Sequence, residues 1–218
     1  MKDLKGKVLV GLASVSMLGG IALGSVQGFA AVNAQSDVQV RFNPYTGGGE
    51  DPGNLALAYV PAGIDFGNNN LSAPGTPVFY NGTTNGADYV AVDDDRASGG
   101  DWKLVASASV LQSTTTSQTI SSGNITLTST SNVLDYDVNI GTPADPASLG
   151  SVSTGVTQSA SATLPLGGGS QTIATSTNTV NQGYAIPIDT VRLNMTSSNS
   201  HGGQTFAGKI TWELSDTI

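Results

Sequence analysis

Short runs of alternating apolar and polar residues recur along the chain and restrict it to a fold built from strands. The clearest run is LDYDVNI, from Leu134 to Ile140, in which every second residue is apolar and the residues between are Asp or Asn. A period of two is typical of a strand with one face buried and one in solvent. No segment of useful length repeats its apolar residues with the helical period. We therefore expect an all-β chain, a single antiparallel β-sandwich (Ig-like or related) with long loops rich in Ser, Thr and Gly.

Other segments have the same character, and turn-forming Gly, Pro and Asn residues separate them. The predicted strands are Val38–Phe42, Leu55–Val60, Val78–Tyr80, Tyr89–Val92, Trp102–Leu111, Thr119–Thr128, Gln171–Val180, Tyr184–Met195 and Phe206–Leu214. The segment Thr142–Gly169 is poor in aromatic residues, so we expect a long surface excursion there. Within it, LPLGG (Leu164–Gly168) loosely resembles a sortase signal, but no membrane segment follows, and we interpret it as a loop.

The first 34 residues have the pattern of a secretory signal peptide. Three lysines precede an apolar run from Val8 to about Val26, and small residues follow it as far as Ala34. The small residues favour cleavage after Ala34 over a retained membrane anchor. We therefore expect a signal peptide at residues 1–34 and one domain at residues 35–218.

Charge and cysteine content exclude several classes of partner. Cleavage after Ala34 would remove three lysines and Asp3, which changes the net charge from −8 to −10. Such a chain is repelled by nucleic acid and by anionic polymers, so we expect no nucleic-acid partner. The chain contains no cysteine, which rules out disulfides, thiolate metal sites and a lipid-modified N-terminal cysteine. Attachment to a cell would therefore be non-covalent.

Residues that could perform catalysis are few. The one histidine, His201, lies among loop-forming residues, and no nucleophile motif accompanies it. Asp93, Asp94, Asp95 and Asp101 could suggest calcium, but the spacing of a calcium loop is missing. We favour a solvated acidic turn, partly neutralised by Arg96. Two carboxylates would suffice for a glycosidase, yet nothing singles out a pair. We expect no enzyme activity, no catalytic residue, no cofactor and no metal.

Each of the two tryptophans begins a Trp-x-Leu motif. Trp102-Lys103-Leu104 and Trp212-Glu213-Leu214 are 110 residues apart. Alternation places each Trp and Leu on the apolar face of a strand. The residues expected on these faces are Trp102, Leu104, Ala106, Ala108 and Val110, and Phe206, Gly208, Ile210, Trp212 and Leu214. These tryptophans could be core anchors on two neighbouring strands, the interpretation we favour, or contacts for carbohydrate or protein.

The surroundings of the two motifs resemble a known family. Asp94-x-Arg96 and Gly99 precede the first motif, and ITWELSDT (Ile210–Thr217) contains the second; GNLALAYVP (Gly53–Pro61) and IDFG (Ile64–Gly67) lie upstream. Together they resemble the WxL domain of Gram-positive surface proteins, over residues 38–218. The chain departs from the family pattern where Ile218 replaces a proline and where Ala97-Ser98 replaces the common Gly-Thr.

The resemblance implies a secreted protein of the cell surface that attaches to the Gram-positive cell wall, with peptidoglycan as ligand. Its candidate determinants of wall or partner binding would be Trp102, Leu104, Trp212, Leu214, Asp94 and Arg96. The family also implies a membrane-anchored partner with Ig-like domains and other WxL proteins. A structural or adhesive protein that contacts this partner, or a host matrix protein, is the alternative function. The negative charge disfavours anionic teichoic acids as the ligand.

Overall fold

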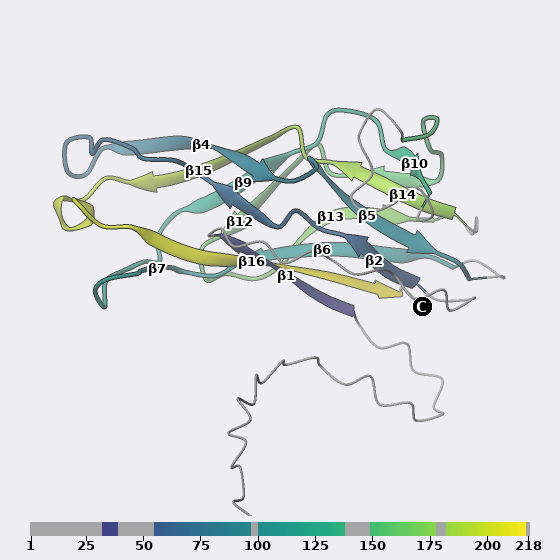
Figure 1. The fold of residues 1–218 in the computed structure, drawn as a ribbon, viewed down its shortest axis with the longest axis horizontal. Coiled ribbons are helices and arrows are strands. Elements are labelled where there is room, and N and C mark those ends of the chain that lie inside the picture. Colours follow the sequence, from purple (N-terminus) through teal and green to yellow (C-terminus); the bar gives the residue numbers. More distant parts are fainter. Residues whose placement is uncertain (1–31, 39–54, 97–99, 138–148, 178–181, 217–218) are drawn as a thin grey trace, which may run out of the picture.

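A computed structural model describes residues 32–38, 55–96, 100–137, 149–177 and 182–216, and nearly all of its regular structure is strand (Figure 1). The expected all-β class is thus confirmed. The strands are β1 Val32–Val38, β2 Leu55–Tyr59, β3 Gly63–Asp65, β4 Pro77–Asn85, β5 Tyr89–Asp94, β6 Trp102–Ala108, β7 Leu111–Ser113, β8 Thr119–Ile120, β9 Asn124–Thr128, β10 Leu134–Tyr136, β11 Val156–Gln158, β12 Ser161–Pro165, β13 Gln171–Ser176, β14 Gln182–Pro187, β15 Thr190–Thr196 and β16 Phe206–Asp216. A 3-10 turn, η3, spans Asn199–His201.

The strands form one large sheet and one small sheet. The large sheet has the order β11-β13-β6-β16-β1-β3-β4-β15-β9-β12, with the β7–β8 hairpin attached to β16. The small sheet has the order β10-β14-β5-β2. Neighbouring strands pair antiparallel, apart from one parallel pairing of β1 with β3. The large sheet turns back on itself, so that β4, β15 and β9 lie over β6, β16 and β1 (Figure 1). The arrangement is sandwich-like; its relation to the Ig fold stays a prediction.

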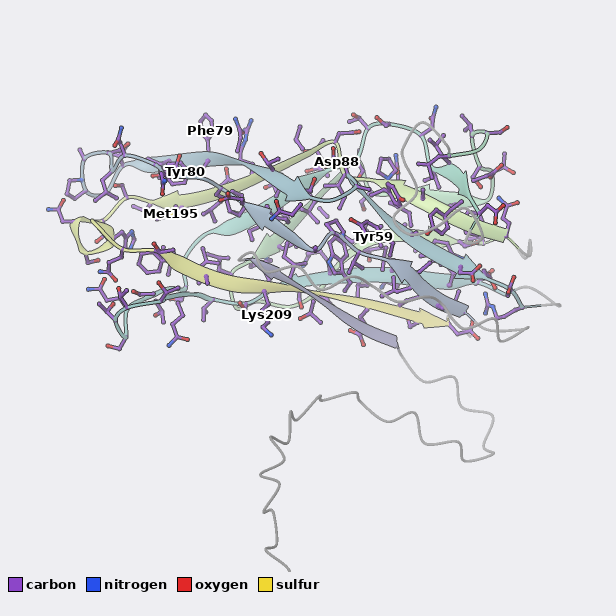
Figure 2. All side chains as sticks on the ribbon, viewed as in Figure 1. Tyr59, Phe79, Tyr80, Asp88, Met195 and Lys209 are labelled. Atoms are coloured by element: carbon purple, nitrogen blue, oxygen red, sulfur yellow. The ribbon has the colours of Figure 1, made fainter. Side chains whose placement is uncertain are left out.

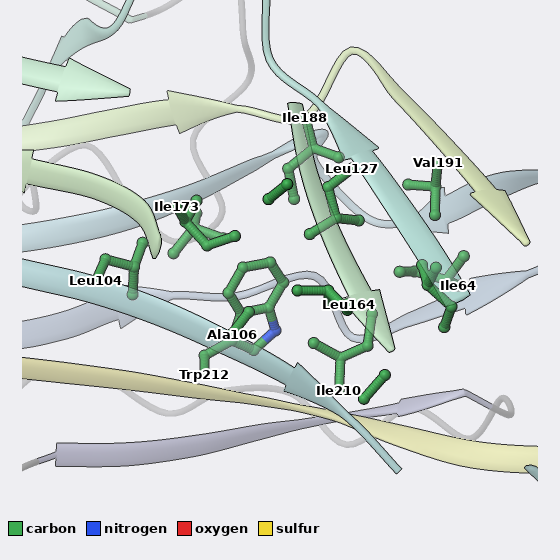
Figure 3. Packing of buried hydrophobic residues seen from close by; sticks show 14 of the residues in the cluster. Ile64, Leu104, Ala106, Leu127, Leu164, Ile173, Ile188, Val191, Ile210 and Trp212 are labelled. Atoms are coloured by element: carbon green, nitrogen blue, oxygen red, sulfur yellow. The ribbon is translucent and has the colours of Figure 1, made fainter. Parts of the chain in front are cut away.

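The core fills the space between these layers. Trp212 and Ile210 from β16 meet Leu164 from β12 and Leu127 from β9 (Figure 3). Alternation produces this layer directly, because β6 buries every second residue beginning with Trp102. A smaller cluster packs Tyr89 between Tyr59 and Tyr136, with ring centroids 5.2 and 6.0 Å apart.

The predicted surface excursion at Thr142–Gly169 is wrong over its second half. Residues 142–148 lie outside the described residues, but Val156–Gln158 and Ser161–Pro165 are strands. Ala162, Leu164 and Leu166 are buried, so the stretch interpreted as a loop belongs to the core. Every second residue of this stretch is apolar, so it can form a strand with one buried face. The Ser- and Thr-rich composition makes this alternation difficult to recognise in the sequence.

Several predicted strands are shorter than expected. The run from Leu134 ends as a strand at Tyr136, and its last residues lie outside the described ones. Val110 does not share the buried face of Trp102: it is 37% exposed, because β6 ends at Ala108 before the chain enters β7. The segments predicted as Thr119–Thr128 and Tyr184–Met195 each divide into two strands.

The N-terminal strand bears on the predicted signal peptide. Strand β1 begins at Val32 and pairs Ala34 with Trp212 of β16. Cleavage after Ala34 would therefore leave Gln35–Val38 to pair with β16. The cleavage itself stays a prediction, since residues 1–31 lie outside the described ones. Within the described ranges no helix has the length and hydropathy needed to cross a bilayer.

Candidate functional site

The two Trp-x-Leu motifs lie side by side in the large sheet. Strands β6 and β16 pair antiparallel, with Leu104 opposite Leu214 and Trp212 opposite Ala106. All four Trp and Leu side chains are buried, at 1% exposure or less. The core interpretation of the motifs is thus confirmed, and so is the expectation that the two strands are neighbours.

The two indoles have different surroundings. Trp212 lies in the middle of the core, and the small Ala106 across the ladder leaves room for its ring (Figure 3). Trp102 packs against Tyr184 of β14, with ring centroids 5.7 Å apart and planes tilted by 52°. Its Nε1 is buried without a hydrogen-bond partner among the described residues. Both indoles therefore serve the core, and that of Trp102 does so with an unpaired donor.

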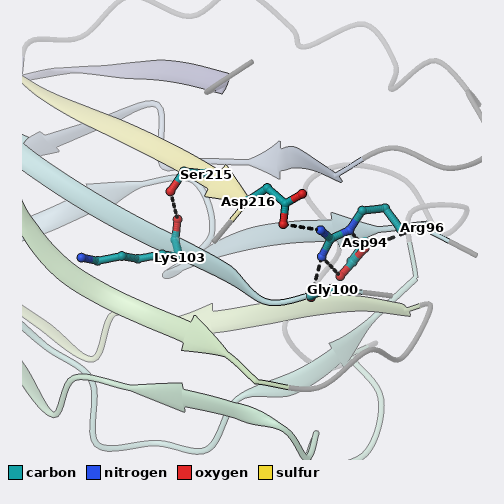
Figure 4. Close-up of polar contacts among 6 residues, drawn as sticks. All are labelled: Asp94, Arg96, Gly100, Lys103, Ser215 and Asp216. Atoms are coloured by element: carbon teal, nitrogen blue, oxygen red, sulfur yellow. Dashed lines mark hydrogen bonds and ion pairs between the residues drawn. The ribbon is translucent and has the colours of Figure 1, made fainter. Parts of the chain in front are cut away.

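Asp94 and Arg96 form a buried ion cluster with Asp216, close to the start of β6 and the end of β16 (Figure 4). The Arg96 guanidinium donates to both carboxylate oxygens of Asp94, at 2.7 and 2.8 Å. It also donates to Asp216 Oδ1 at 2.7 Å and to the Gly100 carbonyl oxygen at 2.6 Å. Asp94 is fully buried and Arg96 is 6% exposed. The hydrogen bonds that Arg96 donates to Asp94 are the main cause of a raised Arg96 pKa; burial opposes this rise, and the hydrogen bond to Asp216 adds to it.

This cluster corrects the expected solvated acidic turn. Neutralisation by Arg96 is confirmed for Asp94, but that carboxylate is in the interior and not in solvent. Burial, followed by the charges of Asp95 and Asp94, raises the pKa of the neighbouring Asp93 to about 6. Across the part of the chain that the structure describes, no three His, Asp or Glu side chains come together as a metal-ligand set.

The six candidate binding residues thus form one structural unit. Strand register places Asp216 opposite Trp102, so the ion cluster continues the pairing of the two motifs. All six are buried, at 6% exposure or less. Asp216 was not among the candidates, although it follows the second motif at the same two-residue spacing that separates Trp212 from Leu214.

A groove lies at the opposite end of β16, and none of the six candidates lines it. It has a volume of about 920 Å³, within the range of roughly 300–1,000 Å³ for ligand pockets. Three half-buried aromatic side chains line it, Phe66, Tyr80 and Phe206. His201 stands edge-on to Phe206, with ring centroids 5.4 Å apart. Phe206 and Asp216 begin and end β16, so about 33 Å of strand separates groove and ion cluster.

The floor of the groove is apolar and its rim is polar. Leu193 and Met195 of β15 form part of the floor, and Figure 2 shows Met195 and Tyr80 at the same end of the molecule. The rim includes the exposed side chains of Asp65, Asn68 and Thr205. The sequence placed His201 correctly in a loop but did not predict the groove, because its walls come from segments far apart in the chain.

Comparison with protein-family models gives a match over most of the chain. The family model described as "WxL domain surface cell wall-binding" matches residues 33–217. Comparison with curated proteins and with solved structures gave no significant match.

Proposed function

Because the chain belongs to the WxL family of surface cell wall-binding domains, we propose that it attaches non-covalently to the Gram-positive cell wall by binding peptidoglycan. The observation that carries the proposal is the extent of the family match. Residues 33–217 include every described strand apart from the first residue of β1. This extent supports the whole described domain as the wall-binding unit.

Charge favours peptidoglycan over the anionic polymers of the wall. The full chain carries a net charge of −8, and loss of the predicted signal peptide would make it −10. Teichoic acids would be repelled by this charge, whereas peptidoglycan offers neutral sugars and short peptides. This supports peptidoglycan among the polymers of the wall.

The surroundings of the single histidine differ from those of a histidine in a hydrolase triad. His201 Nδ1 has no hydrogen-bond partner among the described residues, and the ring is held by its contact with Phe206. A catalytic histidine is usually oriented by a carboxylate that accepts its second ring proton. Within the described residues, no carboxylate therefore orients His201 as a hydrolase triad requires.

We further propose that Trp102, Leu104, Trp212, Leu214, Asp94 and Arg96 support binding indirectly. They connect β6, β16 and the end of β5 through strand pairing and ion pairs. Replacing any of them would change binding to the extent that it unfolds the domain.

Retention of the secreted domain on purified sacculi tests the proposed ligand. We expect the protein, residues 35–218, to be retained equally on sacculi with and without teichoic acids. Loss of retention on bare sacculi, with retention by the membrane-anchored Ig-like partner or a host matrix protein, would favour the alternative function. Release of soluble muropeptides during incubation would contradict a purely binding role.

A further inference from the structure

The groove at the start of β16 has the chemistry of a carbohydrate site. We propose that it binds a neutral polysaccharide chain of pyranose sugars. The identification of this chain as a wall glycan rests on the proposed function. The groove itself is argued from its own residues.

Three aromatic side chains line the groove, and the core covers each of them only in part. Phe66, Tyr80 and Phe206 are each half-buried, so part of each ring faces the groove. A pyranose ring presents a face of C–H groups, which packs on an aromatic ring as other apolar surfaces do. The apolar floor formed by Leu193 and Met195 extends this surface between the rings.

Strand β4 directs its aromatic residues to opposite sides. Tyr80 points into the groove, whereas Phe79 is 60% exposed on the outer face of the sheet (Figure 2). Phe79 packs under the Arg192 guanidinium, 4.6 Å from the ring centroid. The groove and the outer face thus each carry one aromatic ring of the same strand, which provides a matched control.

The polar groups of the groove suit sugar hydroxyl and amide groups. Asn68 and Thr205 are exposed on the rim and offer both donors and acceptors. The Asp65 carboxylate accepts the Gly67 N–H at 2.7 Å and keeps further acceptor capacity. A few polar groups around an apolar surface are the usual means by which a binding site orients its ligand.

The charge of the groove selects a neutral chain. None of the described residues that line it is a Lys or an Arg. Arg96 is buried in its ion cluster and Arg192 lies on the outer face with Phe79. A phosphate polymer would therefore find no Lys or Arg among the described residues of the groove and would meet the carboxylate of Asp65.

Both walls of the groove are held in place by side chains. Asn69 Nδ2 donates to the Phe66 carbonyl oxygen at 2.7 Å. On the other wall, Gln204 Nε2 donates to Ser200 O at 2.6 Å and to Gln118 Oε1 at 2.7 Å. A Cβ at Gly82 would lie 2.8 Å from the Phe66 ring, so this glycine lets Phe66 pack against β4. A site held in this way loses little conformational entropy on binding.

Titration of the secreted domain with defined polymers tests the proposal. The probes are a β-1,4-linked N-acetylglucosamine tetrasaccharide, a β-1,4-linked glucose tetrasaccharide and a poly(glycerol phosphate), with stripped sacculi in parallel. The variants are Asn68→Arg, which fills the rim from an exposed position, Tyr80→Ala, and Phe79→Ala as the control. Melting temperatures establish that each variant is folded.

We expect a neutral tetrasaccharide to bind, the phosphate polymer not to bind, and Asn68→Arg and Tyr80→Ala to weaken binding by about tenfold or more. Phe79→Ala should bind as the wild type does. If Tyr80→Ala fails to fold, Asn68→Arg decides. Preference between the two sugars distinguishes an N-acetylated glycan from another neutral polysaccharide.

Three results would overturn the proposal: wild-type binding by Asn68→Arg, loss of binding in Phe79→Ala, or binding of the phosphate polymer alone. Retention of wild type and Asn68→Arg alike on sacculi would reject the groove and leave the proposed function intact. Sugar binding in the groove without retention on sacculi would reject the proposed function and leave the groove. If the protein binds neither the tetrasaccharides nor the sacculi, both the groove proposal and the proposed function are contradicted.

Discussion

Leu104 and Leu214 lie directly opposite each other across β6 and β16, although 110 residues separate them in the chain. This pairing joins the two Trp-x-Leu motifs into one antiparallel ladder. Both leucines are buried at 1% exposure or less, and Asp216, two residues further, continues the ladder opposite Trp102. The two Trp-x-Leu motifs are thus the two halves of one core element.

The leucine pair should be energetically coupled. Leu104→Ala and Leu214→Ala should each lower the free energy of unfolding by about 2–5 kcal/mol, because each leaves a cavity in a packed core. The double variant should lose less than the sum, by roughly 0.5–3 kcal/mol, because the partners contact each other. Urea denaturation followed by tryptophan fluorescence measures this. Lys103→Ala, on the other face of β6, is the control with little effect; strict additivity of the leucine variants would contradict the pairing.

The Arg96 cluster should be essential for stability. Arg96→Ala would leave the fully buried Asp94 carboxylate without its partner, which typically costs about 3–5 kcal/mol. Arg96→Lys should recover little, because an ammonium group cannot reproduce the planar fork that reaches Asp94, Asp216 and Gly100.

Two further variants make the Arg96 prediction specific. Asp216→Asn should cost less, because its carboxylate is 12% exposed and bonds to one guanidinium nitrogen. Replacing the buried pair together, by Asp94→Leu with Arg96→Met, should be milder than Arg96→Ala, since no buried charge is left unpaired. Thermal unfolding compares the variants, and an Arg96→Ala protein as stable as the wild type would contradict the assigned role.

The two tryptophans should differ in their tolerance of phenylalanine. Trp102→Phe and Trp212→Phe remove similar apolar area from fully buried sites. Trp102→Phe also removes a buried N–H that has no partner among the described residues, a group whose burial costs about 1–3 kcal/mol. We therefore expect Trp102→Phe to be the less destabilising of the two in chemical denaturation. The reverse order would show that the Trp102 N–H is satisfied in solution.

Stability should fall as the pH rises from about 4 to above 6. Burial, with the charges of Asp95 and Asp94, raises the pKa of Asp93 to about 6. Between its ordinary pKa of about 3.9 and this value, the folded protein keeps a proton that the unfolded chain has lost. Deprotonation above this range is therefore less favourable in the folded state, so the melting temperature should be higher at pH 5 than at pH 7.

The Asp93→Asn variant provides the control for this pH dependence. It should be more stable than the wild type at pH 7 and show a flatter profile. Asp189 affects stability in a lower pH range than Asp93 does. Burial opposes its ionisation, but hydrogen bonds from Ser131 and Thr130 lower its pKa to about 2. Its contribution is complete above its ordinary pKa and is lost only as the pH falls toward 2. A wild-type profile that rises from pH 5 to 7 would contradict the Asp93 prediction.

The sequence predicted what depends on local alternation and missed what depends on distant contacts. The burial of Trp102 and Trp212 follows from the period of two around each residue. The prediction of a loop at Leu164 is wrong because Ser, Thr and Gly neighbours obscure the alternation around this residue, although the same period is present. Prediction of the Asp216 ion pair and of the groove around Tyr80 would require knowledge of the strand order. Their partners come from other parts of the chain, and no local pattern specifies them.

The most direct test of the central claim compares binding with folding in one variant. Retention of Leu104→Ala on stripped sacculi is measured over a range of temperatures, and its folded fraction is measured by circular dichroism under the same conditions. If the Trp-x-Leu motifs act by forming the core, the retained fraction will follow the folded fraction and reach the wild-type level wherever the variant is fully folded. A fully folded Leu104→Ala protein that is not retained would contradict the account and make the motif itself the contact with the wall.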